Sequence, residues 1–181
     1  PWLRRPNGYV KKKTPLHWAA EEGDANTVEK MLWNGFYIDH ETNDDWTPLH
    51  LATRKGHFLV VKLLLRHGAD IHAKINNTLR STTVHIAAMN DHEIVLKLLL
   101  ESGADKSFGE ISLHAASEEG NEQIVKALLE ILENPNQTKS DGESALHVAA
   151  ENGHEIVVKA LLDAGADPNQ TKSVRTCPPY S

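Results

Sequence analysis

Histidine is the residue in this chain whose type and spacing most readily suggest chemistry. The sequence has 181 residues and eleven histidines, and three of these, His50, His57 and His67, fall within residues 45–70 beside a basic pair at 54–55. Imidazole nitrogens bind metal ions and exchange protons near neutral pH. A chemical site would use such a cluster once, whereas an architectural role would repeat it at a fixed spacing.

The histidines do recur, in a motif that reads TPLH in its clearest copies. The motif histidines stand at steps of 33, 35, 29 and 33 residues and are His17, His50, His85, His114 and His147. Six residues after each of them stands Gly23, Gly56, Asp91, Gly120 or Gly153. Twelve residues further stands Gly35, Gly68, Gly103, Leu132 or Gly165. Two internal distances kept through five copies indicate an internal repeat.

Each repeat predicts two short helices. In the second copy, Thr47 suits a helix N-cap and Pro48 suits the first helical position, where a backbone N–H is not needed. Gly56 ends the first helix, because helices commonly end on a residue in the left-handed conformation. A leucine-rich helix follows at 58–66. Neither helix can bury its apolar face within one repeat, so the repeats must stack into an all-α solenoid.

The unit TPLHLA…G…VVKLLLRHGAD resembles the ankyrin repeat, and the resemblance covers about residues 14–171. It implies antiparallel helix pairs, projecting β-hairpins, and a concave face of hairpins and first helices that holds other proteins. We expect an N-terminal flank at 1–13 and an incomplete sixth repeat or tail at 172–181. The five repeats are expected at about 14–46, 47–81, 82–110, 111–143 and 144–171.

The resemblance implies that the motif histidines are structural, each bonding to backbone near a hairpin and tying neighbouring repeats together. Because they lie on successive repeats, they are too far apart to share an ion with ligand distances of about 2.0–2.3 Å. We therefore expect no metal site. Motifs for phosphate or dinucleotide binding, zinc proteolysis and serine hydrolysis do not occur in the sequence. We expect no catalytic residues and no cofactor.

The first helices predict a stripe of residues that contacts a partner. The residue after each motif histidine and those three and four later share one helix face. With Trp46 at a hairpin base, the predicted set is Trp18, Glu21, Glu22, Trp46, Leu51, Arg54, Lys55, Ile86, Met89, Asn90, Glu118, Glu119, Glu151 and Asn152. The tryptophans, Ile86 and Met89 predict an apolar anchor, unless the tryptophans pack against each other. The acids favour a partner protein or peptide with a basic segment, while Arg54 and Lys55 would pair with an acid.

The repeat departs from its pattern at several places, among them a shortened hairpin and a replaced glycine. Gly103 and His114 are 11 residues apart where the regular spacing is 15, so we expect a stub in place of the hairpin at 104–112. The stub is either a docking notch or simple loop drift, which surface loops tolerate. Asp91 replaces a helix-ending glycine, and aspartate enters the left-handed region less readily.

Composition argues against several other classes of protein. The formal net charge is −6 and the pI about 6.0, which argues against a general nucleic-acid binder. The single cysteine, Cys177, cannot form an intrachain disulfide, and no apolar run is long enough to insert into a membrane. We expect a cytoplasmic chain, or one in a host cytoplasm if it is an exported effector. It is expected to be monomeric on its own, without a small-molecule substrate.

The sequence thus predicts a non-catalytic interaction module or adaptor. The alternative is a targeting or substrate-recruiting arm of a larger effector, channel or enzyme whose activity lies outside these residues, which a chain beginning with proline permits. The resemblance also makes Asn169 a candidate hydroxylation site, because asparaginyl hydroxylases that use 2-oxoglutarate modify this hairpin position in ankyrin proteins. A repeat scaffold specifies a shape and does not identify its partner.

Overall fold

The chain is built from short helices. A computed structural model describes residues 12–76, 81–132, 134–139 and 142–171, and this part contains ten α-helices and no strand. The predicted tail at 172–181, and the predicted flank apart from Lys12 and Lys13, lie outside the described residues. The helices are α1 (Pro15–Glu22), α2 (Ala25–Trp33), α3 (Pro48–Arg54), α4 (Phe58–Arg66), α5 (Thr83–Met89), α6 (Glu93–Glu101), α7 (Lys106–Glu119), α8 (Glu122–Leu129), α9 (Ala145–Glu151) and α10 (Glu155–Asp163).

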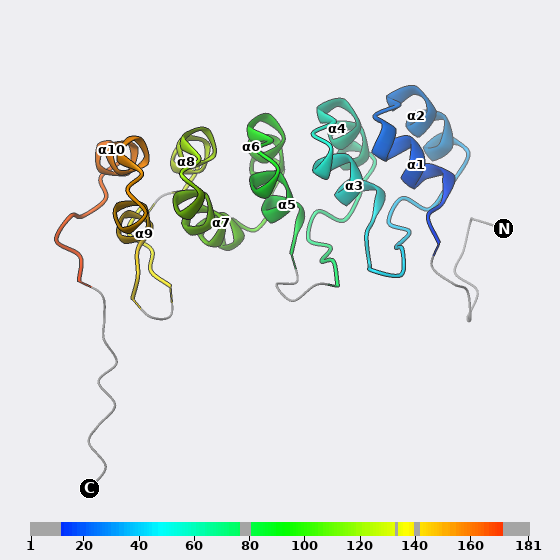
Figure 1. Cartoon of the computed structure of the whole chain (residues 1–181). Helices are drawn as coiled ribbons and strands as arrows, with labels where there is room; N and C mark the ends of the chain where they lie inside the picture. The colour runs from blue at the N-terminus through cyan, green and yellow to red at the C-terminus, as the bar shows by residue number, and fades with distance from the viewer. Residues whose placement is uncertain (1–11, 77–80, 133, 140–141, 172–181) are drawn as a thin grey trace, which may run out of the picture. The chain divides into compact units, whose positions relative to one another are not determined.

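The helices form two compact units, residues 1–108 and 109–181, with the boundary inside α7. In the first unit, α1, α3 and α5 form one layer and α2, α4 and α6 form a second (Figure 1). In the second unit, α7 and α9 carry the first-helix motif and α8 and α10 are the second helices. We call these the first-helix layer and the second-helix layer of each unit. The helix pairs confirm the predicted all-α architecture.

The motif residues explain where the first helices begin. Thr47 is the N-cap of α3, with φ −93° and ψ 165°, and Pro48 follows at the first helical position. The Thr47 hydroxyl accepts a hydrogen bond from the backbone N–H of His50, and the His50 ring in turn accepts from the backbone N–H of Thr47. This reciprocal capping box satisfies two of the N–H groups that every helix start leaves unpaired.

Each unit has its own apolar core between its helix layers. In the first unit, Leu16, Leu49 and Leu64 are at most 1% exposed. In the second unit, Leu128 and Leu161 are completely buried. Alanines on the first helices and leucines on the second let the layers approach closely, so the helix pairs stack through apolar side chains.

The hairpins are tight turns without ladder strands in the described residues, apart from one isolated antiparallel bridge, Thr138 to Ser144. In the first hairpin, the N–H of Thr42 donates to the Trp46 carbonyl at 2.9 Å, and Asp45 has a positive φ of 59°. Lys139 and Glu143 form the same bond at 2.9 Å in the second unit. In the first unit, the loops after α2 and α4 project on the side of the first-helix layer (Figure 1).

The segment 104–112, which was predicted to be a short stub of a hairpin, is largely helical. Helix α7 begins at Lys106, so the first helix of the fourth repeat starts before the expected position 111. Gly109 lies on this extension, and a Cβ built there would be 3.1 Å from Cδ2 of Leu132. With four residues missing, the chain is too short for a hairpin, and helix α7 extends back over Leu132.

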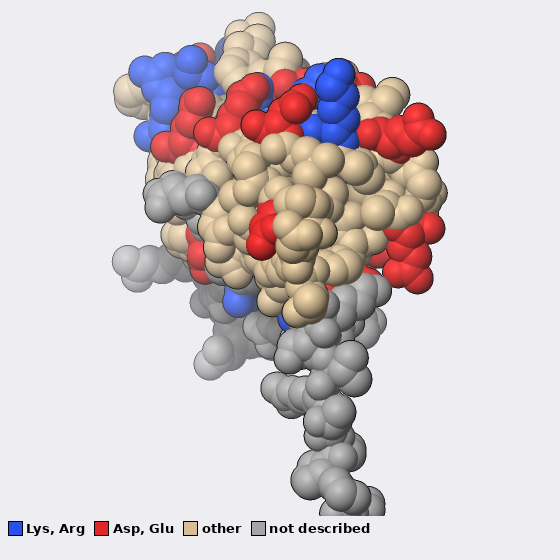
Figure 2. All heavy atoms as spheres, turned by 90° about the vertical axis from the view of Figure 1, so that its left-hand side faces the viewer, with Lys and Arg blue, Asp and Glu red and all other residues tan. Residues whose placement is uncertain are grey.

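Figure 2 looks onto the end of the second unit formed by α9 and α10. Acidic and basic side chains gather along its upper rim, and further acidic side chains lie at the centre and right of this face. A hollow of about 320 Å³ on these helices is lined by Ala150, Gly153, Val158 and Leu162, with Glu155, Lys159 and Asp163 around it. Across the part of the chain that the structure describes, none of the helices has the length and apolar character needed to cross a membrane.

Candidate protein-binding surface

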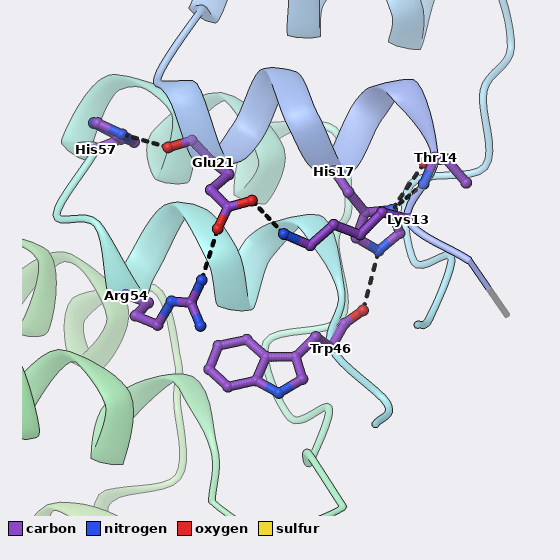
Figure 3. Close-up of polar contacts among 7 residues, drawn as sticks. All are labelled: Lys13, Thr14, His17, Glu21, Trp46, Arg54 and His57. Carbon is purple, nitrogen blue, oxygen red and sulfur yellow. Dashed lines mark hydrogen bonds and ion pairs between the residues drawn. The ribbon is translucent and has the colours of Figure 1, made fainter. Parts of the chain in front are cut away.

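The motif histidines lie between neighbouring repeats. The backbone N–H of Thr14 donates to Nδ1 of His17 at 3.1 Å, so Nε2 carries the ring proton. That nitrogen donates to the Trp46 carbonyl at the base of the next hairpin, at 3.0 Å (Figure 3). His17 therefore caps its own helix and holds the following loop with a single neutral ring.

Two other motif histidines make the same bond between repeats. Nε2 of His50 lies 3.1 Å from the Ala73 carbonyl, and Nε2 of His114 lies 3.1 Å from the Glu143 carbonyl. His85 and His147 make the capping contact with Thr82 and Ser144, respectively. No group of three His, Cys, Asp or Glu residues in the described segments is placed to hold a metal ion.

Burial of these rings predicts a loss of stability in acid. Desolvation lowers the pKa of both His17 and His50 from 6.5 to about 4. The folded state disfavours the protonated ring. The contribution of each neutral ring to the free energy of unfolding is therefore fully present above about pH 6.5 and is lost as the pH falls toward 4. The unfolding free energy should drop by about 2 kcal/mol for each ring between pH 7 and pH 5. Urea unfolding at these two pH values would measure the loss.

Nuclear magnetic resonance provides the matching control. The His17 and His50 ring signals, assigned with single His→Gln variants, should keep their neutral-ring shifts down to about pH 5. Titration of both rings near pH 6.5, with no loss of stability between pH 7 and pH 5, would contradict the prediction.

A second set of histidines was missed by the sequence analysis. His57 and His92 each begin a second helix, and each lies against the glycine that ends the first helix of the preceding repeat. A Cβ built on Gly23 would lie 2.7 Å from the His57 ring, and one on Gly56 would lie 2.6 Å from the His92 ring. Nε2 of His57 also bonds to the Glu21 carbonyl at 2.9 Å.

The second unit repeats this contact. A Cβ on Gly120 would lie 2.5 Å from the His154 ring, whose Nε2 bonds to the Glu118 carbonyl at 2.8 Å. The available signal was the histidine that directly follows the motif position in three of the five repeats, after Gly56, Asp91 and Gly153. Asp24 and Asn121 take the place of this histidine in the first and fourth repeats, and the third repeat has Asp91 in place of the glycine. Asp91 does adopt a positive φ, 59°.

The structure sorts the predicted partner-contacting residues by exposure. Trp18 is 54% exposed and Met89 is 70% exposed. The other exposed members of the set are Glu22, Lys55, Asn90, Glu118, Glu119, Glu151 and Asn152. Leu51 and Ile86 are only 2% and 4% exposed, so these two predicted residues offer little surface to a partner. Both are core residues, buried by the stacking of neighbouring repeats.

Glu21 is already paired within the protein. Its Oε2 lies 2.5 Å from Nζ of Lys13, and its Oε1 accepts from Nη2 of Arg54 at 2.7 Å (Figure 3). The hydrogen bond from Lys13 is the main reason that the pKa of Glu21 lies below its usual value. The predicted acidic and basic stripes of the first two repeats therefore neutralise each other in part.

The two predicted tryptophans each lie beside one of these cations. The Lys13 ammonium is 4.6 Å from the centre of the Trp18 ring, and the Arg54 guanidinium is 4.7 Å from that of Trp46. The Trp46 and His50 rings also pack edge to face, with their centres 6.1 Å apart. Cation–π contacts of this kind orient both partners.

The candidate modification site lies on an exposed loop. Asn169 is exposed, and its backbone N–H donates to Oδ1 of Asp167 at 2.9 Å. Asn136, one repeat earlier, uses its side chain internally: Oδ1 accepts from the Asp167 N–H at 2.7 Å, and Nδ2 donates to the Gly165 carbonyl. Of the two, Asn169 presents the more accessible side chain, and its hydroxylation stays a prediction.

The chain is similar to known repeat proteins. A family model described as ankyrin repeats in three copies matches residues 3–75 and 84–172, and one described as ankyrin repeats in many copies matches residues 54–100. The 26S proteasome non-ATPase regulatory subunit 10 of Dictyostelium discoideum is 49% identical over 61 residues, which cover 33% of this chain and 26% of that protein. Ankyrin repeat domain-containing protein 49 of Bos taurus is 42% identical over 59 residues, 32% of this chain and 25% of that protein.

Some similar proteins are much longer. Palmitoyltransferase AKR1 of Saccharomyces cerevisiae is 42% identical over 64 residues, which cover 35% of this chain and 8% of that protein. The matched stretches thus span about a quarter or less of the length of these curated relatives.

Proposed function

Because the chain belongs to the ankyrin repeat family, we propose that it is a non-catalytic protein-binding segment whose first-helix layers and hairpins hold a partner protein or peptide. Ankyrin repeats form protein-interaction modules, and the observation that carries the proposal here is the exposure of large apolar side chains on the first-helix layer. Trp18 on α1 and Met89 on α5 are 54% and 70% exposed. Aromatic residues and methionine are enriched in the cores of protein interfaces.

The charges of the second unit indicate one property of the partner. Glu118 and Glu119 on α7 and Glu151 on α9 are exposed on its first helices. A basic segment of the partner would complement them, and such complementarity governs orientation and association rate. Binding in the cytoplasm belongs to this proposal, as does hydroxylation of Asn169.

The greater length of some relatives supports an alternative, in which these repeats are the partner-binding part of a larger protein. The chain matches 8% of a palmitoyltransferase and 6% of a human transient receptor potential cation channel of subfamily A. In a protein of that kind these repeats would be a recruiting arm, and an activity would lie outside the matched residues.

Affinity capture from cell lysate, read by mass spectrometry, tests the proposal. We expect Trp18→Ala/Met89→Ala to lower recovery of the bound partner about ten-fold, because truncating two apolar anchors removes central contacts. Glu118→Lys/Glu119→Lys should lower it for a partner with a basic segment. The measurement is the ratio of each captured protein between wild type and variant.

The second-helix layer offers matched controls. Trp33→Ala/Ile94→Ala replaces residues that are 79% and 66% exposed on α2 and α6, and Glu155→Lys/Asp163→Lys reverses two exposed acids on α10. These variants should retain the partner. Loss of the same protein from test and control variants alike would contradict binding through the first-helix layer.

A further inference from the structure

A hollow on the first unit lies between the base of the first hairpin and helix α3. Its volume is about 330 Å³. The lining consists of three cations (Lys12, Lys13 and Arg54), the turn residues 42–44, and the apolar side chains of Trp46 and Leu51. It thus combines an aromatic wall, an apolar floor and a cationic rim in one place.

Glu21 holds two of the three cations of this hollow in position. Glu21 bonds to both Lys13 and Arg54, at 2.5 and 2.7 Å (Figure 3). Its side chain is 13% exposed, whereas those of Lys13 and Arg54 are 32% and 36% exposed. The carboxylate is therefore shielded and the two cations face solvent. Such preorganised donors bind an anion without the entropy cost of ordering long side chains.

The other charged residues of the lining determine which sign of charge the occupant should carry. Lys12 is exposed and has no ion-pair partner among the described residues, which adds a third cation to the rim. Asp44 contributes a carboxylate to the lining. The lining therefore carries an excess of positive charge, while Asp44 would repel a doubly charged phosphate more strongly than a single carboxylate.

We propose that this hollow holds an acidic segment of the partner polypeptide, with a carboxylate at the Lys12–Arg54 rim and a neighbouring apolar side chain against Trp46. The proposal rests on the proposed function and specifies the partner chemistry for the first unit alone. The aromatic wall favours a polypeptide, because an apolar side chain beside the acid would cover the Trp46 ring and exclude water from the ion pair.

Selection from a displayed library of random peptides tests the proposal. The library is selected on the wild-type chain and depleted on Arg54→Gln, and the retained peptides are sequenced. We expect enrichment of peptides with aspartate or glutamate next to an apolar residue. Enrichment of basic or uncharged peptides, or no peptides that distinguish the two proteins, would overturn the assignment.

Affinity measurements on a selected peptide sharpen the test. Arg54→Gln should weaken binding about ten-fold, as expected for loss of a charge-assisted hydrogen bond. Lys12→Gln should also weaken binding, and it leaves the ion pairs of Glu21 with Lys13 and Arg54 in place. Arg66→Gln is the matched control, because Arg54 and Arg66 are the last residues of α3 and α4. Equal affinity of wild type and Arg54→Gln would count against the site.

A phosphoserine version of the same peptide separates the two anion chemistries. Tighter binding of phosphoserine than of glutamate would overturn the carboxylate assignment in favour of a phosphate site. Failure of this inference is distinguishable from failure of the proposed function. If the first-helix variants lose their partner in capture while the selection yields no acidic peptides, only the inference is wrong.

Discussion

Replacing His50 with alanine is expected to lower the free energy of unfolding by about 3–5 kcal/mol, because a buried hydrogen-bonding ring is lost from between two repeats. The ring is completely buried, accepts from the Thr47 N–H at 3.1 Å and donates to the Ala73 carbonyl at 3.1 Å. Alanine would leave both backbone groups without their partner and open a cavity beside Trp46. Urea unfolding followed by circular dichroism measures the change.

His67→Ala is the control for this substitution. His67 follows α4 and is exposed, so its truncation should change the unfolding free energy by no more than about 0.5 kcal/mol. A His50→Ala cost as small as that of His67→Ala would show that the ring does not hold the repeats together.

Gly56→Ala is expected to destabilise the protein by about 3 kcal/mol, substantially more than Gly153→Ala at about 1 kcal/mol. The two glycines have nearly the same φ, 71° and 74°, so the backbone strain of an added Cβ is the same. They differ in surroundings: the His92 ring lies 2.6 Å from a Cβ at Gly56, while nothing described lies within 4 Å at Gly153. The difference between the two variants therefore isolates the contact with the ring.

A double-mutant cycle identifies the cause of that difference. His92→Ala alone removes the bond from Nε2 to the Arg54 carbonyl, which is 2.9 Å long. If the ring causes the extra cost, Gly56→Ala/His92→Ala should be less destabilised than the sum of the two single variants by at least about 1 kcal/mol. Additive effects, or equal costs for Gly56→Ala and Gly153→Ala, would contradict the ring contact.

The sequence pattern predicted the helix pairs because their signals are local. A Thr–Pro start such as 47–48, a capping histidine three residues after the threonine, and a glycine at a positive φ all act within one helix turn. Asp91 stands at the position of the helix-ending glycine and adopts the left-handed conformation there, with a φ of 59°. The capping contact of His50 with Thr47 was not predicted, although the two residues are only three positions apart.

The solvent exposure of the predicted contact residues could not be predicted from their shared helix face. Leu51 and Trp18 occupy the same motif position, yet Leu51 is 2% exposed and Trp18 is 54% exposed. Spacing along a helix shows which residues share a face, but stacking against residues about one repeat away decides whether that face reaches solvent. The spacing also did not show that the side chains of Asn90 and Asn152 are already hydrogen-bonded. Each of them donates to a backbone carbonyl of its own helix.

By itself, the sequence determined the repeat, its helix boundaries to within a few residues, and the positions of the buried histidines, because helix starts and ends depend on residues within one turn. Tertiary structure decided that Glu21 pairs with Lys13 and Arg54 and that the fourth repeat begins with an extended α7. It also decided that the rings of His57, His92 and His154 cover Gly23, Gly56 and Gly120. The physical reason is distance along the chain. Glu21 and Arg54 are 33 residues apart, so only the stacking of one repeat on the next brings their charges together.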